Sequence, residues 1–266
     1  MGFRDVKRSK SAKPLHTIAI INQKGGVGKS TTTVNLAAAL GKQGRKVLIV
    51  DFDPQGNSTS GIGVDKEGLS QCIYDALLHD VPAENLIHDT VSERVFIIPA
   101  TIQLAGAEIE LVSAMARETR LKDLLEPVKD EFDFIFIDCP PSLGLLTINA
   151  LAAADSVLIP IQCEYYALEG VTKLLESMRM VKGRINKDLD TYGGLMTMYD
   201  SRTSLSNQVV EEVQNYFGDI AFKTCIPRSV KVSEAPSYGM PVIEYAPSNK
   251  GARAYMDLAK EVIRRA

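Results

Sequence analysis

A glycine-rich segment at residues 23–31, QKGGVGKST, constrains this chain more than any other feature. It follows a run at residues 15–22 (LHTIAIIN) that is typical of a buried strand, and it opens a segment at 30–43 that is typical of a helix. A strand, a glycine loop and a helix N-terminus in this order favour an anion, because the free N–H groups and the helix dipole attract negative charge. The pattern therefore predicts a loop that binds nucleotide phosphates.

The residue types within this loop suit a nucleoside triphosphate with Mg²⁺. The glycines let the backbone approach phosphate oxygens without a clash with Cβ. Lys29 supplies a positive charge for the β- and γ-phosphates, and the Ser30 hydroxyl can ligate Mg²⁺. The ordinary pattern has Gly where this chain has Gln23, and a second lysine, Lys24, follows. We predict nucleotide contacts from Gly25, Gly26, Val27, Gly28, Lys29, Ser30 and Thr31.

Short β-rich runs alternate with helical segments along the rest of the chain. This alternation predicts an α/β fold with a mostly parallel sheet and helices on both faces, because parallel strands need crossover connections. Residues 53–68 are rich in Gly, Ser and Asn and are expected to form a loop. Strands are expected at 46–51, 94–99, 132–138, 156–161, 192–199 and 221–226, and helices at 69–78, 102–117, 120–129, 143–153, 166–182, 205–217 and 249–264. We predict a single domain over 15–266 after a flexible basic tail over 1–14.

The composition is that of a globular protein and narrows the classes of function. The chain has 266 residues and is 45% hydrophobic, which is enough to bury a core as one domain. Its formal net charge is −3, so any contact with nucleic acid must come from a local basic patch. The four cysteines form no CxxC pair, which argues against an iron–sulfur or zinc site within one chain and suits a reducing cytosol. The sequence contains no run of eighteen apolar residues, so no transmembrane helix is expected.

Aspartates follow two further predicted strands. Asp51 and Asp53 lie in DFDPQ after the strand at 46–51, and Asp138 ends the strand FDFIFID. Because ligands bind beyond the carboxyl ends of strands in such sheets, we expect these side chains beside the phosphate loop. Asp138 can hold Mg²⁺ through a water molecule, and Asp53 can orient the water that attacks the γ-phosphate. Aspartates at strand ends also form turns and cap helices, and the nearby phosphate loop is what favours the catalytic interpretation.

The segment KGGVGKST resembles the deviant Walker A motif of the ParA/MinD class of P-loop NTPases. The resemblance implies that ATP is bound at a dimer interface and that Lys24 reaches across it to the partner's ATP. It also implies that Asp53, the second aspartate of DxDPQGN, is the hydrolytic residue and that Asp51 shapes the surroundings of Mg²⁺. The implied catalytic residues are Lys24, Lys29 and Asp53, and the implied metal site is formed by Ser30, Asp138 and Asp51.

Four longer stretches resemble the ParA/Soj partitioning ATPases in particular: DFDPQGNSTSGIG, FIFIDCPPSLGLLTINAL, MYDSRTSLSNQVVEEV and IPRSVKVSEAPSYGMPV. The resemblance covers about 18–259 and implies an ATP-bound homodimer with slow hydrolysis that a ParB/Spo0J-like protein stimulates. It further implies non-specific binding to double-stranded DNA, in the cytoplasm and on the nucleoid, for chromosome or plasmid segregation. Pro227 matches the region of the family that packs beside adenine, although a structural turn proline is an equal alternative.

Basic residues on a face created by dimerisation are implied to contact the DNA. Arg202 in YDSRT and Lys231 in SVKVSEAP match these positions, although the family commonly has Arg where this chain has Lys231. Lys250, and less directly Arg253, are further candidates. No aromatic residues interleave with these charges, so the expected contacts are to phosphates and insensitive to base sequence. A solvated surface charge is the alternative for each of them.

Other functions that use the same core stay open at this point. A MinD-like membrane-cycling ATPase would need a C-terminal amphipathic segment, whereas here the apolar face of Tyr255, Leu258, Ala259 and Val262 ends soon and is expected to pack on the core. An iron–sulfur carrier would need paired cysteines, and Cys139 stands alone and is expected to be a buried thiol. The DPQGNSTSG and SEAPSYG segments disfavour a small-molecule ligase. A scaffold without activity would be expected to lack Lys29, Asp53 or Asp138, and all three are present. A transcriptional regulator that only binds DNA would need a helix-turn-helix, and the sequence shows none.

Overall fold

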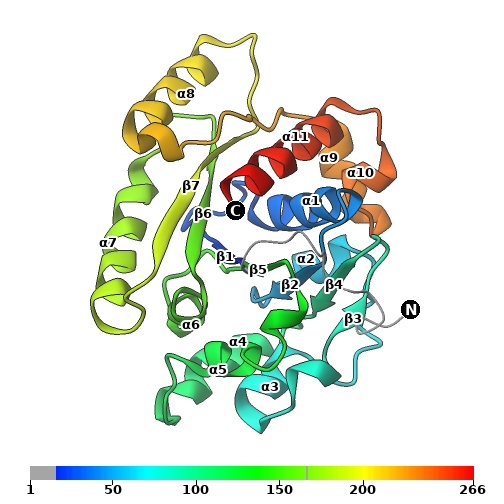
Figure 1. Cartoon of the computed structure of the whole chain (residues 1–266), viewed down its shortest axis with the longest axis vertical. Helices are drawn as coiled ribbons and strands as arrows, with labels where there is room; N and C mark the ends of the chain where they lie inside the picture. Colours follow the sequence, from blue (N-terminus) through cyan, green and yellow to red (C-terminus); the bar gives the residue numbers. More distant parts are fainter. Residues whose placement is uncertain (1–15, 166) are drawn as a thin grey trace.

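The computed structural model describes residues 16–165 and 167–266, and the predicted tail over 1–14 lies outside them. The described strands form one seven-stranded sheet in the order β3-β4-β2-β5-β1-β6-β7 (Figure 1). The strands are β1 (His16–Ile20), β2 (Val47–Asp51), β3 (His88–Asp89), β4 (Val95–Ile98), β5 (Phe134–Asp138), β6 (Ser156–Gln162) and β7 (Asp190–Thr197). β3 pairs antiparallel with β4 and the other neighbouring strands pair in parallel, so the predicted mostly parallel sheet is confirmed.

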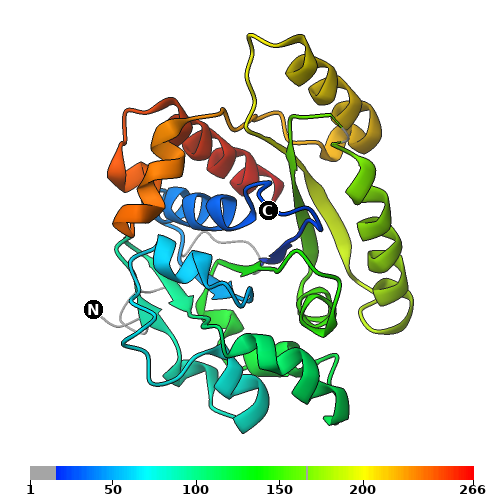
Figure 2. The same ribbon diagram turned by 180° about the vertical axis from the view of Figure 1, so that it is seen from behind.

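Helices cover both faces of this sheet, as predicted (Figures 1 and 2). One layer contains α1 (Lys29–Lys42), α9 (Val230–Glu234), α10 (Val242–Tyr245) and α11 (Lys250–Arg265). The other contains α3 (Ile73–His79), α4 (Leu104–Glu110), α5 (Arg120–Leu125), α6 (Leu145–Ala153), α7 (Glu169–Arg184) and α8 (Ser204–Phe217). The short helix α2 (Asn57–Gly61) packs between β2 and α1, in a segment where we expected only a loop. Single 3₁₀ turns lie at Ala83–Asn85, Leu111–Ser113, Lys129–Glu131, Gly218–Ile220 and Ala235–Tyr238.

Strand side chains alternate between two hydrophobic cores, one under each helix layer. In β2, Leu48 and Val50 belong to the core under α3–α8, whereas Val47 and Ile49 belong to the core under α1 and α11. All four are buried. A strand covered on both faces needs apolar residues at successive positions, which is why the central strands are continuous hydrophobic runs.

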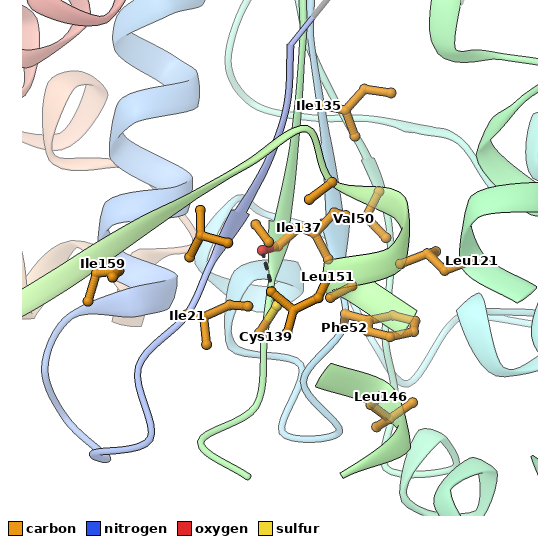
Figure 3. Packing of buried hydrophobic residues seen from close by; sticks show 14 of the residues in the cluster. Ile21, Val50, Phe52, Leu121, Ile135, Ile137, Cys139, Leu146, Leu151 and Ile159 are labelled. Carbon is orange, nitrogen blue, oxygen red and sulfur yellow. Dashed lines mark hydrogen bonds between the residues drawn. The ribbon is translucent and has the colours of Figure 1, made fainter. Parts of the chain in front are cut away.

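Cys139, directly after β5, is part of the core under α3–α8 (Figure 3). Its side chain is fully buried, and its Sγ contacts the carbonyl oxygen of Ile137 at 3.6 Å. Burial raises the pKa of the Cys139 thiol well above its usual value, so the thiol stays protonated and unreactive. The prediction of a buried thiol is therefore confirmed. In the described part of the chain, no group of three or more His, Cys, Asp or Glu side chains could hold a metal ion.

The predicted strand at 221–226 is wrong. This segment runs beside the edge strand β7, where the Phe222 N–H donates to the Gly194 carbonyl at 3.0 Å and the Ile226 N–H donates to the Met196 carbonyl at 2.9 Å. The segment therefore advances four residues while β7 advances two, and a regular ladder cannot form at that ratio. Only an isolated bridge between Tyr199 and Pro227 follows.

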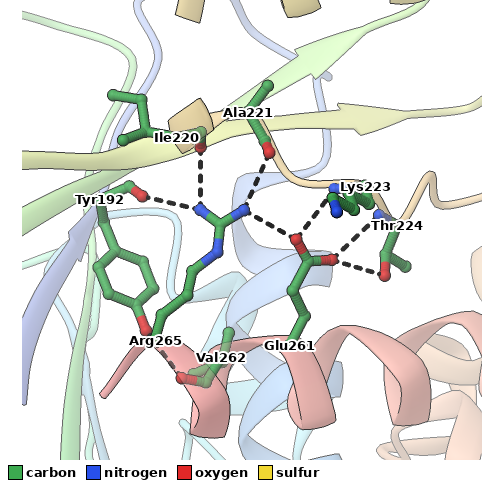
Figure 4. A network of polar contacts seen from close by, with 8 residues as sticks. All are labelled: Tyr192, Ile220, Ala221, Lys223, Thr224, Glu261, Val262 and Arg265. Atoms are coloured by element: carbon green, nitrogen blue, oxygen red, sulfur yellow. Dashed lines mark hydrogen bonds and ion pairs between the residues drawn. The ribbon is translucent and has the colours of Figure 1, made fainter. Parts of the chain in front are cut away.

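The C-terminal helix α11 is connected to the edge of the sheet by a network of polar groups around the buried Glu261 and the half-buried Arg265 (Figure 4). The Arg265 guanidinium donates to the carbonyls of Tyr192, Ile220 and Ala221 at 3.2, 2.9 and 2.9 Å, and to Glu261 at 2.7 Å. The apolar face of α11 is buried as predicted, since Tyr255, Leu258, Ala259 and Val262 have at most 1% of their surface exposed. None of the helices within the described residues is long and apolar enough to cross a membrane.

Candidate nucleotide-binding site

The loop between β1 and α1 has the backbone conformation that a phosphate-binding loop needs. Gly26 and Gly28 have φ angles of 75° and 90°, a region that residues with a Cβ rarely adopt. No side chain caps the N-terminus of α1, which begins at Lys29. The N–H groups of its first turn are therefore available to an anion.

Two polar side chains that sequence reasoning did not select hold this loop in place. Asn22 donates from Nδ2 to the Pro160 carbonyl at 2.7 Å and accepts the Lys24 N–H on Oδ1 at 2.9 Å. Thr197, the last residue of β7, donates its hydroxyl to the Val27 carbonyl at 2.8 Å. Both lie at carboxyl ends of strands, and that position is the one signal that could have identified them.

A cavity of about 430 Å³ opens above the loop and brings predicted residues from two strand ends together. Lys29, Ser30 and Asp53 all face it, although Asp53 is 24 positions away in sequence from Lys29. The full lining consists of Gly25, Gly26, Gly28, Lys29, Ser30, Thr31, Val34, Asn35, Asp53, Gln55, Asn57, Ser60, Gly61, Pro141, Met198, Pro236 and Met240. Lys24, Val27, Asp51, Asp138 and Pro227 are not part of that lining.

Asp51 and Asp138 end the neighbouring strands β2 and β5 and are paired in register. The helix α2 supplies hydroxyl groups to both. The Thr59 N–H and hydroxyl each donate to Asp51 Oδ2 at 2.7 Å, and the Ser58 hydroxyl donates to Asp138 Oδ2 at 2.7 Å. These donors were not predicted, because the serine- and threonine-rich segment was interpreted as a loop.

The two carboxylates are fully buried, and this raises their pKa values. For Asp51 the loss of solvation is the main cause and the charge of Asp138 adds to it, against the hydrogen bonds from Thr59. For Asp138 the loss of solvation again comes first, and the hydroxyls of Ser58 and Ser30 and the charge of Lys29 act against it. A pair of buried carboxylates with raised pKa values is an arrangement that a bound cation would stabilise.

Asp138 retains an oxygen that could serve such a cation. Its Oδ1 is buried and has no hydrogen-bond partner among the described residues. The Ser30 hydroxyl lies close enough to influence the Asp138 pKa through a hydrogen bond. The Ser30 hydroxyl at the start of α1 and the Asp138 carboxylate at the end of β5 are ligands that suit Mg²⁺, which prefers oxygen ligands and keeps several waters. The residues present therefore fit Mg²⁺ beside nucleotide phosphates.

Comparisons with known proteins decide the family. The family model AAA_31, described as an AAA domain, matches residues 15–191. The sporulation initiation inhibitor protein Soj of Bacillus subtilis (strain 168) is 60% identical over 245 residues, which cover 92% of this chain and 97% of Soj. The chromosome partitioning protein ParA of Myxococcus xanthus (strain DK1622) is 52% identical and covers 93% of this chain and 88% of its own length. This chain belongs to the ParA/Soj family.

Solved structures agree with the P-loop NTPase fold and with the cofactors. A protein of Mycobacterium smegmatis described as cobyrinic acid a,c-diamide synthase, solved with ADP and magnesium, is 39% identical with a TM-score of 0.83 and covers 94% of this chain and 95% of its own. The septum site-determining protein MinD of Pyrococcus horikoshii OT3, solved with Mg-ADP, is 29% identical with a TM-score of 0.79 and covers 94% and 96%. The bound nucleotide and magnesium of these relatives support ATP and Mg²⁺ as cofactors of the family site.

Asp53, the residue that the ParA/Soj resemblance assigns to hydrolysis, lies at the edge of the cavity with 6% of its surface exposed. Its Oδ1 accepts the Gln55 N–H at 3.0 Å, and its own N–H donates to Asp51 Oδ1 at 3.3 Å. Asp51 thus orients the backbone that carries Asp53, while Asp53 presents its carboxylate to the cavity. The geometry is compatible with a group that positions a water molecule.

Lys24, which the ParA/MinD resemblance assigns to the ATP of a partner chain, does not line the cavity of its own chain. Its ammonium group forms an ion pair with Glu164, which follows β6, and 48% of the Lys24 side chain is exposed. Lys29, by contrast, is 7% exposed and lines the cavity. Lys29 therefore points into the cavity, whereas Lys24 points toward Glu164 at the end of β6.

The cavity contains apolar side chains that were not predicted. Pro236 and Met240 come from the SEAPSYGMPV segment, and Met198 follows β7. Pro227, which we assigned to the adenine region, lies outside the cavity lining and forms the bridge with Tyr199. These residues come from distant parts of the chain, so no local motif could have identified them.

The candidate DNA-binding residues lie in two separate surroundings. Arg202, in the turn before α8, has an 87% exposed side chain and donates to Asp200 at 2.9 and 2.7 Å. These hydrogen bonds, and to a much lesser extent the charge of Lys250, hold the pKa of Asp200 well below its usual value. Lys231, on α9, pairs with Glu234 at 2.8 Å and lies 5.4 Å from the ring centre of Tyr245. Tyr245 is 14 positions away from Lys231 in the sequence, so this neighbour comes from the fold and not from a local pattern.

Proposed function

We propose that this protein is an ATP-hydrolysing DNA-partitioning protein of the ParA/Soj type. An ATP-bound homodimer binds double-stranded DNA without sequence preference, and hydrolysis stimulated by a ParB/Spo0J-like protein releases it. The cycle takes place in the cytoplasm, on the nucleoid, and segregates a chromosome or a plasmid. The observation that carries this proposal is the convergence of Lys29, Ser30 and Asp53 on one cavity beside the buried carboxylate of Asp138.

Each part of the site has a separate role in ATP hydrolysis. The N–H groups at the start of α1 and the Lys29 ammonium bind the phosphates, and Ser30 with Asp138 would hold Mg²⁺, with Asp51 ordering the segment around it. Mg²⁺ supplies charge neutralisation at the β- and γ-phosphates when bound. Asp53 would orient the water molecule that attacks the γ-phosphate. Gly25, Gly26, Val27, Gly28 and Thr31 shape the phosphate loop, and Pro227 is proposed to lie near the adenine.

A single chain is proposed to hydrolyse ATP slowly. Of its two loop lysines, Lys29 lines its own cavity, whereas Lys24 is directed away from it. Charge that develops on the γ-phosphate is then only partly compensated until the Lys24 of a second copy arrives. The rate of hydrolysis therefore depends on dimerisation and on the partner protein. Residues 15–266 are proposed to form one ATPase domain.

DNA contact is proposed to come from Arg202, Lys250 and Lys231, with binding through phosphates. Such binding falls steeply with salt, because each neutralised phosphate releases counterions. The alternative, a MinD-like membrane-cycling ATPase, would need an apolar surface for the bilayer. The apolar face of α11 is buried against the core and is not available for that purpose.

The test is binding of the purified protein to random duplex DNA with ATP, with ADP and without nucleotide, at low and moderate salt. Binding that requires ATP and weakens with salt is the expected result. Anionic vesicles under the same nucleotide conditions serve as the comparison. ATP-dependent binding to vesicles without binding to DNA would replace this proposal with the membrane-cycling one.

A further inference from the structure

The ion pair between Lys24 and Glu164 connects the phosphate loop to the end of β6. Exposed ion pairs of long side chains often form and break freely and then carry little meaning. The backbone on each side of this pair, however, is held by hydrogen bonds, so the two charged groups are brought together by the fold.

On the loop side, the Lys24 N–H donates to Asn22 Oδ1 at 2.9 Å, and Asn22 in turn donates to the Pro160 carbonyl of β6 at 2.7 Å. On the strand side, the Glu164 N–H donates to the Gln162 carbonyl at 2.8 Å. Lys24, through Asn22, and Glu164 are therefore both anchored to β6, at Pro160 and Gln162. The side chain of Glu164 is 34% exposed, so solvent reaches the pair but does not surround it.

We propose that Glu164 is a positioning residue that retains Lys24 on its own chain and thereby limits ATP-dependent pairing of two copies. The inference rests on the proposed function, in which Lys24 serves the ATP of a second copy. Without an ion pair, the Lys24 side chain would sample many directions, including the cavity of its own chain, where Lys29 already supplies a positive charge. The carboxylate of Glu164 keeps Lys24 at the rim of the site, outside the cavity and accessible from solvent.

Dimerisation then exchanges one partner of Lys24 for another. In a symmetric pair of chains each Lys24 leaves its Glu164, so two ion pairs are broken for every dimer formed. The triphosphate carries more negative charge than one carboxylate and can compete for the lysine, whereas an empty site offers no replacement. Glu164 thus makes the pairing of two chains more dependent on bound ATP.

The test is the replacement Glu164→Gln, which removes the charge and keeps the size of the side chain. Sedimentation velocity over a protein concentration series with Mg-ATP measures the dimer dissociation constant. Because each exposed ion pair contributes little and two are lost, we expect this constant to fall about threefold to tenfold. Glu164→Asp keeps the charge and should stay close to the unmodified protein.

A matched control is Glu126→Gln, which removes an exposed carboxylate that pairs with Lys129 away from the cavity and should leave dimerisation unchanged. Affinity for a fluorescent ATP analogue at low protein concentration should not change in Glu164→Gln. A generally damaged fold would weaken dimerisation, so a gain is a result that a structural role cannot produce.

An unchanged or weaker dimer in Glu164→Gln, with ATP-dependent dimers of the unmodified protein, overturns the role of Glu164 and leaves the proposed function in place. If neither protein dimerises with Mg-ATP, the dimeric cycle of the proposed function fails and the inference fails with it.

Discussion

Asp51 and Asp138 are partners in the register of β2 and β5, yet their carboxylates are bound in different ways. Asp51 accepts hydrogen bonds on both oxygens, two from Thr59 and one from the Asp53 N–H. Asp138 accepts the Ser58 hydroxyl on Oδ2, while its buried Oδ1 has no hydrogen-bond partner within the described chain. Asp51 therefore orders the polypeptide, and Asp138 has an oxygen available for a cation.

Asp138→Asn should weaken the binding of Mg-ATP about tenfold or more, because groups that support a bound metal typically have effects of this size. Titration of a fluorescent ATP analogue with Mg²⁺ and with a chelator measures the effect, and binding in the chelator should change much less. Asp51→Asn is the matched control and should keep most of the magnesium dependence. Equal losses in both variants would contradict the different roles of the two carboxylates.

Thr59→Val should lower the free energy of unfolding by about 1–3 kcal/mol. The replacement removes a hydroxyl that donates to Asp51 Oδ2 at 2.7 Å and accepts the Ala100 N–H at 3.0 Å, so two buried groups lose a partner. Urea denaturation of the protein without nucleotide measures the change. Ser60→Ala is the control, since among the described residues its hydroxyl donates only to the Gly56 carbonyl, one turn earlier. A similar small loss in both variants would argue against a special role for Thr59.

Asp53→Ala should retain nucleotide binding and reduce ATP hydrolysis about a hundredfold or more, as expected for loss of a group that positions or activates water. The ATP-bound dimer should then remain on DNA. Phosphate release and binding of a fluorescent nucleotide, measured on the same preparation, separate the two effects. Loss of nucleotide binding itself would show that Asp53 holds the site together and does not act on the water.

Arg202→Glu should reduce DNA binding at least about tenfold and make the remaining binding less dependent on salt, because a phosphate contact is replaced by repulsion. Dimerisation with ATP should be unaffected, since Arg202 contacts only Asp200 of its own turn in the described structure. Arg179→Glu introduces the same charge change on α7 and should have little effect on DNA. Equal losses in both would indicate a general effect of net charge.

Glu261→Gln should destabilise the protein by about 1–3 kcal/mol at neutral pH. Burial alone would raise the pKa of Glu261, but hydrogen bonds from Lys223, Thr224 and Arg265 outweigh it and lower the pKa below its usual value (Figure 4). An acid with a lowered pKa in the folded state stabilises the protein above its unfolded-state pKa, and this contribution is lost as the pH falls through the folded-state value. The difference between the two proteins should therefore shrink below about pH 4.5. A difference that stays constant from pH 7 to pH 4 would exclude the charge of Glu261 as its source.

Local sequence patterns were sufficient to predict the sheet and the phosphate loop. The alternation of strands and helices predicted the sheet, and the residues from Gly25 to Thr31 predicted the loop between β1 and α1. These features depend on neighbours in sequence, since a glycine loop and a helix start need only a few consecutive residues. The segment at 221–226 was predicted incorrectly for the same reason, because its composition is that of a strand while its register against β7 is irregular.

Local sequence patterns could not predict the contacts between segments that are distant in the chain. Ser58 and Thr59 form a short helix whose hydroxyls bind the carboxylates of Asp138 and Asp51, although their sequence is that of a loop. Pro236 and Met240 reach the cavity because the 3₁₀ turn at Ala235–Tyr238 packs against α2 and the following helix α10 packs against α1. The pairing of Lys24 with Glu164 joins residues 140 positions apart.

The sequence alone determined the class of fold, the phosphate loop and the identity of three aspartates at strand ends, because each of these depends on local periodicity and on the chemistry of single residue types. Only the tertiary structure decided which of those aspartates keeps an oxygen for a cation, which lysine enters the cavity and which stays at its rim. Those distinctions depend on strand order and on hydrogen bonds between segments that are remote in the chain, and a linear pattern contains neither.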